Sequence, residues 1–382
     1  MNPSKECRCL QTLNIGFDAS LLMLFMPLYF GGTLVFPGED MIDGLRGTNT
    51  WILTPSMLQA VGDPEQYNDL RTIQVCGEPL SHTLAKRWIK AYDGKLIFIN
   101  GYGPTETTVN SHFEVVHTPD NSLIAIGPTI PNVQCYLLDD ALHMVPVGVM
   151  GEICIGGIGV SHGYLNDEQR SREVFVPNPF GSGLLYRTGD LGCWLPDGRV
   201  YCVGRKDTQI KLRGFRIELG EVESWCERLG LNIQQAAALV INKQLVAYVS
   251  PQSVNVDEVT LALKQSLPYY MVPAHIIPVD DIPKTQNGKV DRRALMEYPL
   301  PEAMSNSITY ADSTSEFSDT YRLVARLALQ ALQFAETHPL PVPSISFFVL
   351  GGDSISAVFF SSLCRKQGLD VTVAKIFALQ TL

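Results

Sequence analysis

The feature that most constrains the fold is a pattern of apolar strand, glycine turn and helix that recurs in the first third of the chain. Residues 72–80 run from an apolar strand through Gly77 into a helix start, and residues 96–107 run from a buried strand into a loop rich in glycine and proline. Strands that alternate with helices in this way predict a mostly parallel sheet. Because ligands of such sheets bind beyond the carboxyl ends of the strands, these turns are where a site is expected.

Length and composition narrow the class of protein. A chain of 382 residues predicts two or three domains, and 46% hydrophobic with 18% charged residues is typical of a globular protein with a real core. The net charge of −10 argues against general nucleic-acid binding. The nine cysteines form no paired framework, which indicates reduced thiols, and Cys7 and Cys9 lack a second pair at zinc-ligand spacing.

No targeting or membrane segment is evident in the sequence. The apolar run 21–30 is too short to span a bilayer and contains Pro27. The N-terminus has no positively charged lead into a small-residue cleavage site. We therefore expect a cytoplasmic protein without a membrane partner.

Residues 204–223 mix charge and glycine more densely than a core strand requires. Apolar and charged residues alternate there with a period of two, which predicts two short strands interrupted at Gly214. Acidic residues after Gly220 favour the start of a helix. Taken by itself, this pattern fits a solvated β-hairpin equally well.

The order of residues in 204–223 resembles the hinge motif of the adenylate-forming enzymes, in particular the adenylation domains of nonribosomal peptide synthetases. Further blocks match that family in its own order from Phe17 to Lys289. A block at Ser354 resembles the phosphopantetheine attachment site of a peptidyl carrier domain. Together the matching blocks cover nearly the whole chain.

The resemblance implies an α/β protein with the adenylate-forming fold. That fold would comprise a partial large lobe with mostly parallel sheets and a small β region, a small α+β C-terminal lobe, and then a small helical carrier domain. The implied boundaries are 1–206 for the C-terminal portion of the adenylation core, 207–299 for the small subdomain, 300–319 for a polar linker, and 320–382 for an incomplete carrier domain.

The resemblance also implies that ATP and Mg²⁺ bind at the strand ends. Tyr102 would offer a flat face to adenine, Thr105 a hydroxyl to a phosphate, and Glu106 a hard oxygen ligand to Mg²⁺. Asp190 would accept both ribose hydroxyls, and Arg205 would donate to ribose or phosphate. The other residues implied in binding ATP or AMP are Gly77, Glu78 and Gly103.

A pocket for an amino acid is implied as well. Asp18 precedes an apolar segment, where capping a helix is the ordinary role of aspartate. In the resembling family this aspartate pairs with the α-ammonium group of the substrate, and a buried carboxylate needs such a partner. The pocket would suit a neutral amino acid with a medium or large apolar side chain. The residues implied to line it are Asp18, Ala19, Leu22, Ile52, Gln74, Cys76, Gly101, Val109 and Asn110.

Catalysis in the resembling family consists of positioning and charge neutralisation. Glu106 and Lys289 are the implied catalytic side chains, and Lys289 would bridge the substrate carboxylate and the ATP phosphate. Asp207 is the implied hinge about which the small lobe rotates between the two half-reactions. That rotation would move Lys289 out of the active site and bring the loop of Gly214 into it.

The implied activity is ATP-dependent adenylation of an amino acid and its transfer as a thioester to 4′-phosphopantetheine on Ser354. Ser354 lies at a predicted helix start, where the helix dipole favours a phosphodiester. The implied partners are the amino-acid substrate, a phosphopantetheinyl transferase and neighbouring synthetase domains such as condensation domains.

Residues 1–16 contain no match to the phosphate loop that precedes the Phe17 block in the family. Since that loop would donate N–H groups to the triphosphate, we expect adenylation by this stretch of chain to be impaired. One alternative is a catalytically inactive remnant that acts only as scaffold or carrier. Another is an acyl- or aryl-acid ligase of the same superfamily, although Asp18 argues against a substrate without an α-amine. A nucleophile-elbow hydrolase is disfavoured, because residues 352–356 lack the second glycine of that motif.

Overall fold

A computed structural model gives the structure of the chain in two compact units, Met1–Asp207 and Thr208–Leu382, which are described separately. The residues described are 6–376 without 39–40, 118–122, 207–208, 213–214, 242–243, 286–289, 299–316 and positions 333, 336, 344, 346, 349, 351, 353 and 374. Three residues assigned above to catalysis or hinge motion, Asp207, Gly214 and Lys289, lie outside the described residues, as does most of the expected linker.

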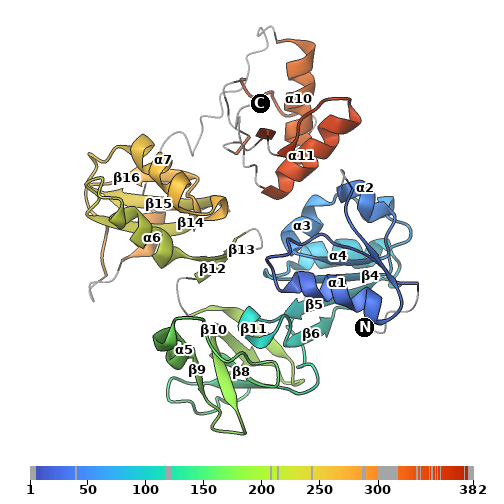
Figure 1. The fold of residues 1–382 in the computed structure, drawn as a ribbon, viewed down its shortest axis with the longest axis vertical. Helices are drawn as coiled ribbons and strands as arrows, with labels where there is room; N and C mark the ends of the chain where they lie inside the picture. Colours follow the sequence, from blue (N-terminus) through green and yellow to red (C-terminus); the bar gives the residue numbers. More distant parts are fainter. Residues whose placement is uncertain are drawn as a thin grey trace. The chain divides into compact units, whose positions relative to one another are not determined.

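The first unit contains a six-stranded sheet with the strand order β2-β1-β3-β4-β5-β6 (Figure 1). Every neighbouring pair is parallel except β5 and β6, which confirms the mostly parallel sheet that the sequence predicted. The strands are β1 (Arg8–Leu10), β2 (Thr33–Val35), β3 (Thr50–Leu53), β4 (Thr72–Cys76), β5 (Ile97–Tyr102) and β6 (His112–Val115). The helices between them are α1 (Ala19–Tyr29), α2 (Met41–Arg46), α3 (Pro55–Ala60) and α4 (His82–Ala91), with 3₁₀ turns η1 (Pro64–Gln66) and η2 (Thr105–Thr107).

Local signals explain where these helices begin. Thr54 accepts a hydrogen bond from the Met57 amide in front of Pro55, and Ser81 caps α4 in the same way. The two faces of the sheet are covered by different helices, because neighbouring residues of a strand point to opposite faces. Ile52 packs with α1, whereas the ring of Trp51 meets that of Trp88 on α4 at a centroid distance of 5.7 Å.

Helix α1 carries no charged residue. It buries Met23 and Met26 against the sheet, whereas Phe25 and Tyr29 are 65% and 83% exposed. Its apolar character therefore extends well beyond the face that the sheet covers. In the part of the chain that is described, no helix has the length and apolarity needed to cross a membrane.

The second sheet of this unit is antiparallel and has the order β11-β10-β8-β7, with β9 paired to β10. It is the small β region that the resemblance implied, and a turn at Asp197–Gly198 joins β10 to β11. A shift of register between Arg187 and Leu191 marks a bulge in β10. The elements are β7 (Val133–Leu138), β8 (Gly151–Gly157), α5 (Glu168–Val174), β9 (Phe175–Pro177), β10 (Leu184–Trp194) and β11 (Val200–Arg205).

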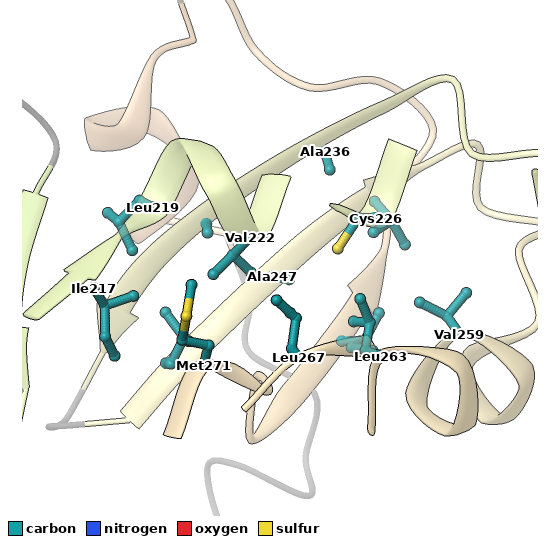
Figure 2. Packing of buried hydrophobic residues seen from close by; sticks show 14 of the residues in the cluster. Ile217, Leu219, Val222, Cys226, Ala236, Ala247, Val259, Leu263, Leu267 and Met271 are labelled. Atoms are coloured by element: carbon teal, nitrogen blue, oxygen red, sulfur yellow. The ribbon is translucent and has the colours of Figure 1, made fainter. Parts of the chain in front are cut away.

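The second unit begins with the hairpin that the sequence predicted, β12 (Gln209–Leu212) and β13 (Phe215–Glu218), followed by α6 (Leu219–Arg228). A three-stranded sheet, β14-β15-β16, follows. Helix residues Val222, Cys226 and Leu263 pack on one face of this sheet, around Ala247 (Figure 2). The remaining elements are β14 (Gln235–Ile241), β15 (Gln244–Ser250), α7 (Val256–Ser266), η3 (Tyr269–Met271), β16 (His275–Pro278) and α8 (Arg292–Met296).

The last part of the chain is helical, as expected for a carrier domain. It contains α10 (Asp319–Ala331), capped by Ser318, and α11 (Ser354–Lys366). The ring of Phe347 stacks on that of Phe360 at a centroid distance of 5.1 Å. Gly352 lies so close to this ring that a Cβ atom there would approach Phe347 Cδ1 to 2.4 Å, so that only glycine fits.

All nine cysteines are free thiols, and none of them is fully exposed. Burial raises the pKa of five thiols to about 12; these are Cys9, Cys135, Cys154, Cys226 and Cys364. They therefore behave as small apolar side chains rather than as nucleophiles.

Candidate active site

The turn after β4 contains the first two residues implied in nucleotide binding. Gly77 has a φ of +88°, a conformation that glycine adopts without strain. Glu78 accepts hydrogen bonds at Oε2 from the amide and the hydroxyl of Ser56, at 2.9 and 2.6 Å. Its Oε1 atom is buried and has no hydrogen-bond partner among the described residues. That oxygen fits a donor supplied by a ligand.

The loop after β5 is tightly built and locally strained. A Cβ atom on Gly103 would lie 2.5 Å from the Val109 carbonyl oxygen, which excludes any other residue there. Thr108 and Val109 both have a positive φ, at 62° and 67°, which is unfavourable for β-branched residues. A hydrogen bond of 2.7 Å from Thr108 Oγ1 to the Gly159 carbonyl helps to hold this conformation. Backbone strain of this kind is common at ligand sites.

Glu106, the implied Mg²⁺ ligand, is held within this loop and is 7% exposed. Tyr164 donates its hydroxyl to Glu106 Oε1 at 2.6 Å, and the Ser161 amide donates to the Glu106 carbonyl at 2.9 Å. Thr105, the implied phosphate ligand, is exposed beside it. No group of three or more His, Cys, Asp and Glu side chains placed to hold a metal occurs in the described ranges. A single fixed carboxylate nevertheless fits Mg²⁺, which is bound through one or two carboxylates and substrate phosphates.

Tyr102, Asp190 and Arg205 form one buried polar group. Tyr102 donates its hydroxyl to Asp190 Oδ2 at 2.5 Å, and Arg205 Nη1 donates to Asp190 Oδ1 at 3.1 Å. Burial, together with the charge of Asp190, raises the pKa of Tyr102 well above its ordinary value, so the phenol stays protonated. The Tyr102 ring packs in an apolar cluster that includes Ile153 and Val200. The structure thus brings three residues assigned to the nucleotide together and gives the Tyr102 hydroxyl a role that the sequence did not suggest.

Each oxygen of Asp190 still has acceptor capacity, because a carboxylate offers about four lone-pair sites. The carboxylate can therefore accept two ribose hydroxyls as additional donors. The nucleotide residues implied by the sequence come from the turn after β4, from the end of β5 and the loop that follows it, and from β10 and β11.

His112 is a buried neighbour of this group that the sequence analysis missed. Its ring lies edge-on to Tyr102 at a centroid distance of 5.7 Å, and its Nδ1 atom pairs with Ser111 Oγ at 2.8 Å. Its Nε2 atom is buried without a hydrogen-bond partner in the described chain. Burial lowers the pKa of His112 from 6.5 to about 4, so the imidazole is neutral at pH 7.

This lowered pKa predicts a stability that decreases in acid. The unfolded chain, in which the imidazole has its ordinary pKa of 6.5, takes up the proton before the folded chain does. The free energy of unfolding therefore falls as the pH decreases from 6.5 towards 4, by at most about 1.4 kcal/mol per pH unit. Urea unfolding between pH 7 and 5 measures this effect: the free energy of unfolding should depend less steeply on pH for His112→Asn than for the wild type. The exposed His143 is the control, and an equal change of slope in His143→Asn would contradict the prediction.

Apart from Val109, which lies in the loop after β5, the residues implied to line the amino-acid pocket lie on or against one face of the six-stranded sheet. Register places Ile52 opposite Gln74 and Cys76 opposite Gly101, so these side chains share that face. Ala19 and Leu22 of α1 pack on the same cluster as Ile52 and Cys76. A Cβ atom on Gly101 would lie 3.0 Å from Gln74 Nε2 and 3.1 Å from Asn110 Oδ1, so Gly101 separates these two amides.

Several polar atoms on this face are buried without hydrogen-bond partners among the described residues. Asp18 caps α1 by accepting the Ala19 amide at Oδ1, at 2.8 Å, but its Oδ2 atom is unpartnered. Gln74 is fully buried, and neither its oxygen nor its nitrogen is hydrogen-bonded. The Nδ2 atom of Asn110 is likewise buried without a hydrogen-bond partner among the described residues. Because buried polar groups are nearly always paired in native proteins, this cluster indicates a ligand site.

Three family models match the chain. The model of the AMP-binding enzyme matches residues 1–165, that of the AMP-binding enzyme C-terminal domain matches residues 231–289, and that of the phosphopantetheine attachment site matches residues 323–382. With the fold and the site described above, these matches define an adenylate-forming enzyme region joined to a carrier domain.

Relatives narrow this class. The chain is 38% identical over 360 residues to nonribosomal peptide synthetase 5 of Aspergillus fumigatus, covering 94% of this chain and 16% of that protein. It is 37% identical over 400 residues to bacitracin synthase 3 of Bacillus licheniformis, covering 99% of this chain and 6% of that protein. The chain therefore spans a small part of the curated relatives it matches. Together with the three family models, these relatives identify the chain as an adenylation region followed by a carrier region, the combination that nonribosomal peptide synthetases contain.

A solved structure shows the same combination of domains. Holo-PA1221, described as a nonribosomal peptide synthetase protein containing adenylation and peptidyl carrier domains bound to a vinylsulfonamide inhibitor, has a TM-score of 0.75 and 29% identity to this chain. The match covers 96% of this chain and 62% of that one. Adenylation domains of this family use ATP with Mg²⁺, and their carrier domains bear 4′-phosphopantetheine.

Proposed function

We propose that the chain activates a neutral α-amino acid with ATP and receives it as a thioester on phosphopantetheine attached to Ser354. In the first step a carboxylate oxygen of the amino acid attacks the α-phosphorus of ATP, and pyrophosphate leaves. In the second step the phosphopantetheine thiol attacks the acyl carbon, and AMP leaves. The observation that carries the proposal is the Oδ2 atom of Asp18, which is buried and has no hydrogen-bond partner among the residues that the structure describes.

Asp18 distinguishes this function from that of an acyl- or aryl-acid ligase. A free carboxylate oxygen in a buried pocket is costly unless a cation pairs with it, and the α-ammonium group of an amino acid supplies that cation. An acid without an amine would leave the oxygen unpaired. The pocket residues support a neutral substrate side chain of medium or large size, because none of those named apart from Asp18 is charged. Gln74 and Asn110 offer hydrogen bonds to one polar group.

The contacts of the nucleotide residues support the roles that the resemblance implies for them. Asp190 accepts the ribose hydroxyls, and Arg205 fixes Asp190 and reaches the nucleotide. Glu106, oriented by Tyr164, provides the carboxylate for Mg²⁺, which when bound neutralises phosphate charge. Lys289, the Asp207 hinge and the Gly214 loop retain the roles that the resemblance implies. The proposed partners are a phosphopantetheinyl transferase and neighbouring synthetase domains.

Amino-acid-dependent exchange of pyrophosphate into ATP tests this function across the standard amino acids. We expect exchange that is weak, in line with the impaired adenylation expected from the sequence, and that is greatest for neutral residues of medium or large size. A preference for aspartate, glutamate, lysine or arginine would contradict the proposal, because their charge would be buried without a partner. Exchange that proceeds equally well with des-amino acids would favour the acyl-acid ligase instead.

The buried amide of Gln74 predicts that the folded chain without ligand is less stable than it would be with an apolar side chain at this position. Gln74→Met keeps the size of the side chain and removes a buried amide that has no hydrogen-bond partner in the described part of the chain, so the folded chain should gain about 1–3 kcal/mol. Thermal unfolding without ligand measures the gain. The control is Gln134→Met, because Gln134 accepts a hydrogen bond from Asn178 at 3.2 Å and should not be stabilised by the change. A lower melting temperature for Gln74→Met would show that the amide is satisfied within the folded chain.

A further inference from the structure

Glu152 is a buried carboxylate that the activity described so far does not use. It lies on β8, a strand in which six of the seven residues are buried, and its side chain is 7% exposed. An ionised carboxylate in such a place is costly unless it is paired and hydrogen-bonded. The groups that pair with Glu152 therefore indicate which part of the structure this carboxylate stabilises.

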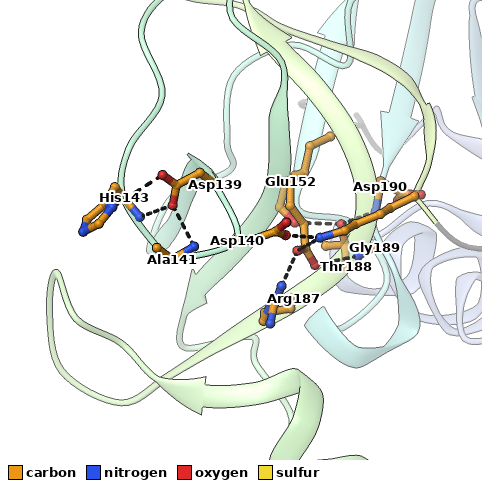
Figure 3. Close-up of polar contacts among 11 residues, drawn as sticks. Asp139, Asp140, Ala141, His143, Glu152, Arg187, Thr188, Gly189 and Asp190 are labelled. Atoms are coloured by element: carbon orange, nitrogen blue, oxygen red, sulfur yellow. Dashed lines mark hydrogen bonds and ion pairs between the residues drawn. The ribbon is translucent and has the colours of Figure 1, made fainter.

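The two hydrogen bonds that Glu152 accepts come from residues at the bulge of β10 (Figure 3). Arg187 Nη2 donates to Glu152 Oε2 at 2.7 Å, and the Gly189 amide donates to Glu152 Oε1 at 3.2 Å. Lys206 Nζ lies 3.9 Å from Oε2 and also pairs with the exposed Asp140. Glu152 thus binds one residue before and one residue within the segment where the ladder between β8 and β10 shifts register.

Gly189 is fixed from both sides. Its carbonyl accepts the Lys206 amide at 2.8 Å, while its own amide donates to Glu152. It has a φ of +73°, and the next residue in the chain is Asp190. The Asp190 amide in turn donates to Thr188 Oγ1 at 2.9 Å. A bulge held in this manner re-aims the side chain that follows it, here toward Tyr102 and Arg205.

We infer that Glu152 is a positioning residue for Asp190: by binding Arg187 and the Gly189 amide, it sets the Asp190 carboxylate in the orientation that receives the ribose hydroxyls of the nucleotide. The inference rests on the proposed function, in which Asp190 binds ribose. Glu152 itself touches neither Asp190 nor Tyr102 through any of the contacts described above. Its effect on the nucleotide passes through the backbone of the bulge.

The test compares AMP with 2′,3′-dideoxy-AMP as ligands of the purified chain, by titration calorimetry. The wild type should bind AMP more tightly by on the order of tenfold or more, since hydrogen bonds to a charged acceptor are lost with the hydroxyls. Glu152→Ala should reduce this ratio to near one while leaving the affinity for dideoxy-AMP unchanged. A general loss of structure would weaken both ligands alike and leave the ratio intact. Glu152→Gln, which keeps an acceptor for only one of the two donors, should give an intermediate ratio.

Two further variants make the result specific. Glu168→Ala removes an acid of the exposed helix α5 and should leave the ratio as in the wild type. In an Asp190→Asn background, Glu152→Ala should cause no additional loss of ribose discrimination. The effects of substitutions at coupled residues do not add, and Glu152 acts on ribose only through Asp190. If Glu152→Ala still discriminated fully between AMP and dideoxy-AMP, the inference about Glu152 would be overturned, whereas the ribose role of Asp190 would stand. Absence of discrimination in the wild type would overturn both the inference and the ribose role of Asp190 in the proposed function.

Discussion

Ser354→Ala should abolish the attachment of phosphopantetheine completely. Ser354 is the first residue of α11, so a phosphodiester on it would lie at the N-terminus of a helix, where backbone N–H groups and the dipole favour negative charge. Two residues before this helix, position 352 lies so close to the Phe347 ring that only glycine fits there. Incubation with a phosphopantetheinyl transferase and coenzyme A, followed by intact-mass measurement, gives the result directly.

The matched control is Ser318→Ala. Ser318 caps α10 in the same part of the chain, with Ser318 Oγ accepting the Tyr321 amide at 3.2 Å. Loss of that cap should cost about 1 kcal/mol of stability and leave the chain fully modified. Modification that persists in Ser354→Ala would overturn the assignment of the site. An unmodified wild-type chain would show that this carrier domain is not a substrate for the transferase.

Asp18→Ala should weaken binding of ligands that carry an α-ammonium group by about 1.5–3 kcal/mol, or roughly ten- to a hundredfold. The reason is that Asp18 Oδ2 is buried without a partner in the described structure, so the ammonium group completes a charge-assisted hydrogen bond. The measurement is the affinity for the aminoacyl sulfamoyl adenosine of the preferred amino acid. Its des-amino counterpart should bind Asp18→Ala no worse than it binds the wild type.

Asp18→Ser separates the pocket role from the helix-capping role. Serine keeps an acceptor for the Ala19 amide, so the stability of α1 should be retained while the charge is lost. Asp18→Ser should therefore bind the aminoacyl ligand as weakly as Asp18→Ala does, with a higher melting temperature. Equal weakening of both ligands in either variant would mean that Asp18 acts only through the helix.

Much of the fold could be predicted because its signals are local. The strand, turn and helix start of residues 72–80 and the two short strands before a helix in 204–223 are specified by neighbouring residues, and the structure has both. The grouping of Ile52, Cys76 and Ala19 in one cluster followed from a resemblance over ordered blocks rather than from any single pattern.

The supporting contacts could not be predicted because they join distant parts of the chain. Tyr102 and Asp190 are 88 positions apart, and Tyr164 and Glu106 are 58 apart. Glu152 in an otherwise apolar strand was a visible anomaly, but nothing local indicates that its partner is the Gly189 amide, 37 positions later. A sequence pattern can indicate which residue meets a ligand, whereas the residues that orient it are determined by tertiary packing.

The enclosed thiols have a consequence for chemical labelling. At neutral pH a thiol with a pKa of about 12 is ionised to only on the order of one part in a hundred thousand, and alkylating reagents attack the thiolate. A phosphopantetheine arm would instead carry its sulfur into water. With the half-buried Cys193 and Cys202 replaced by serine, the fast phase of maleimide incorporation would count arms that carry a free thiol. Acylation of an arm would remove it from that phase, so one alkylation time course would report the occupancy of the carrier.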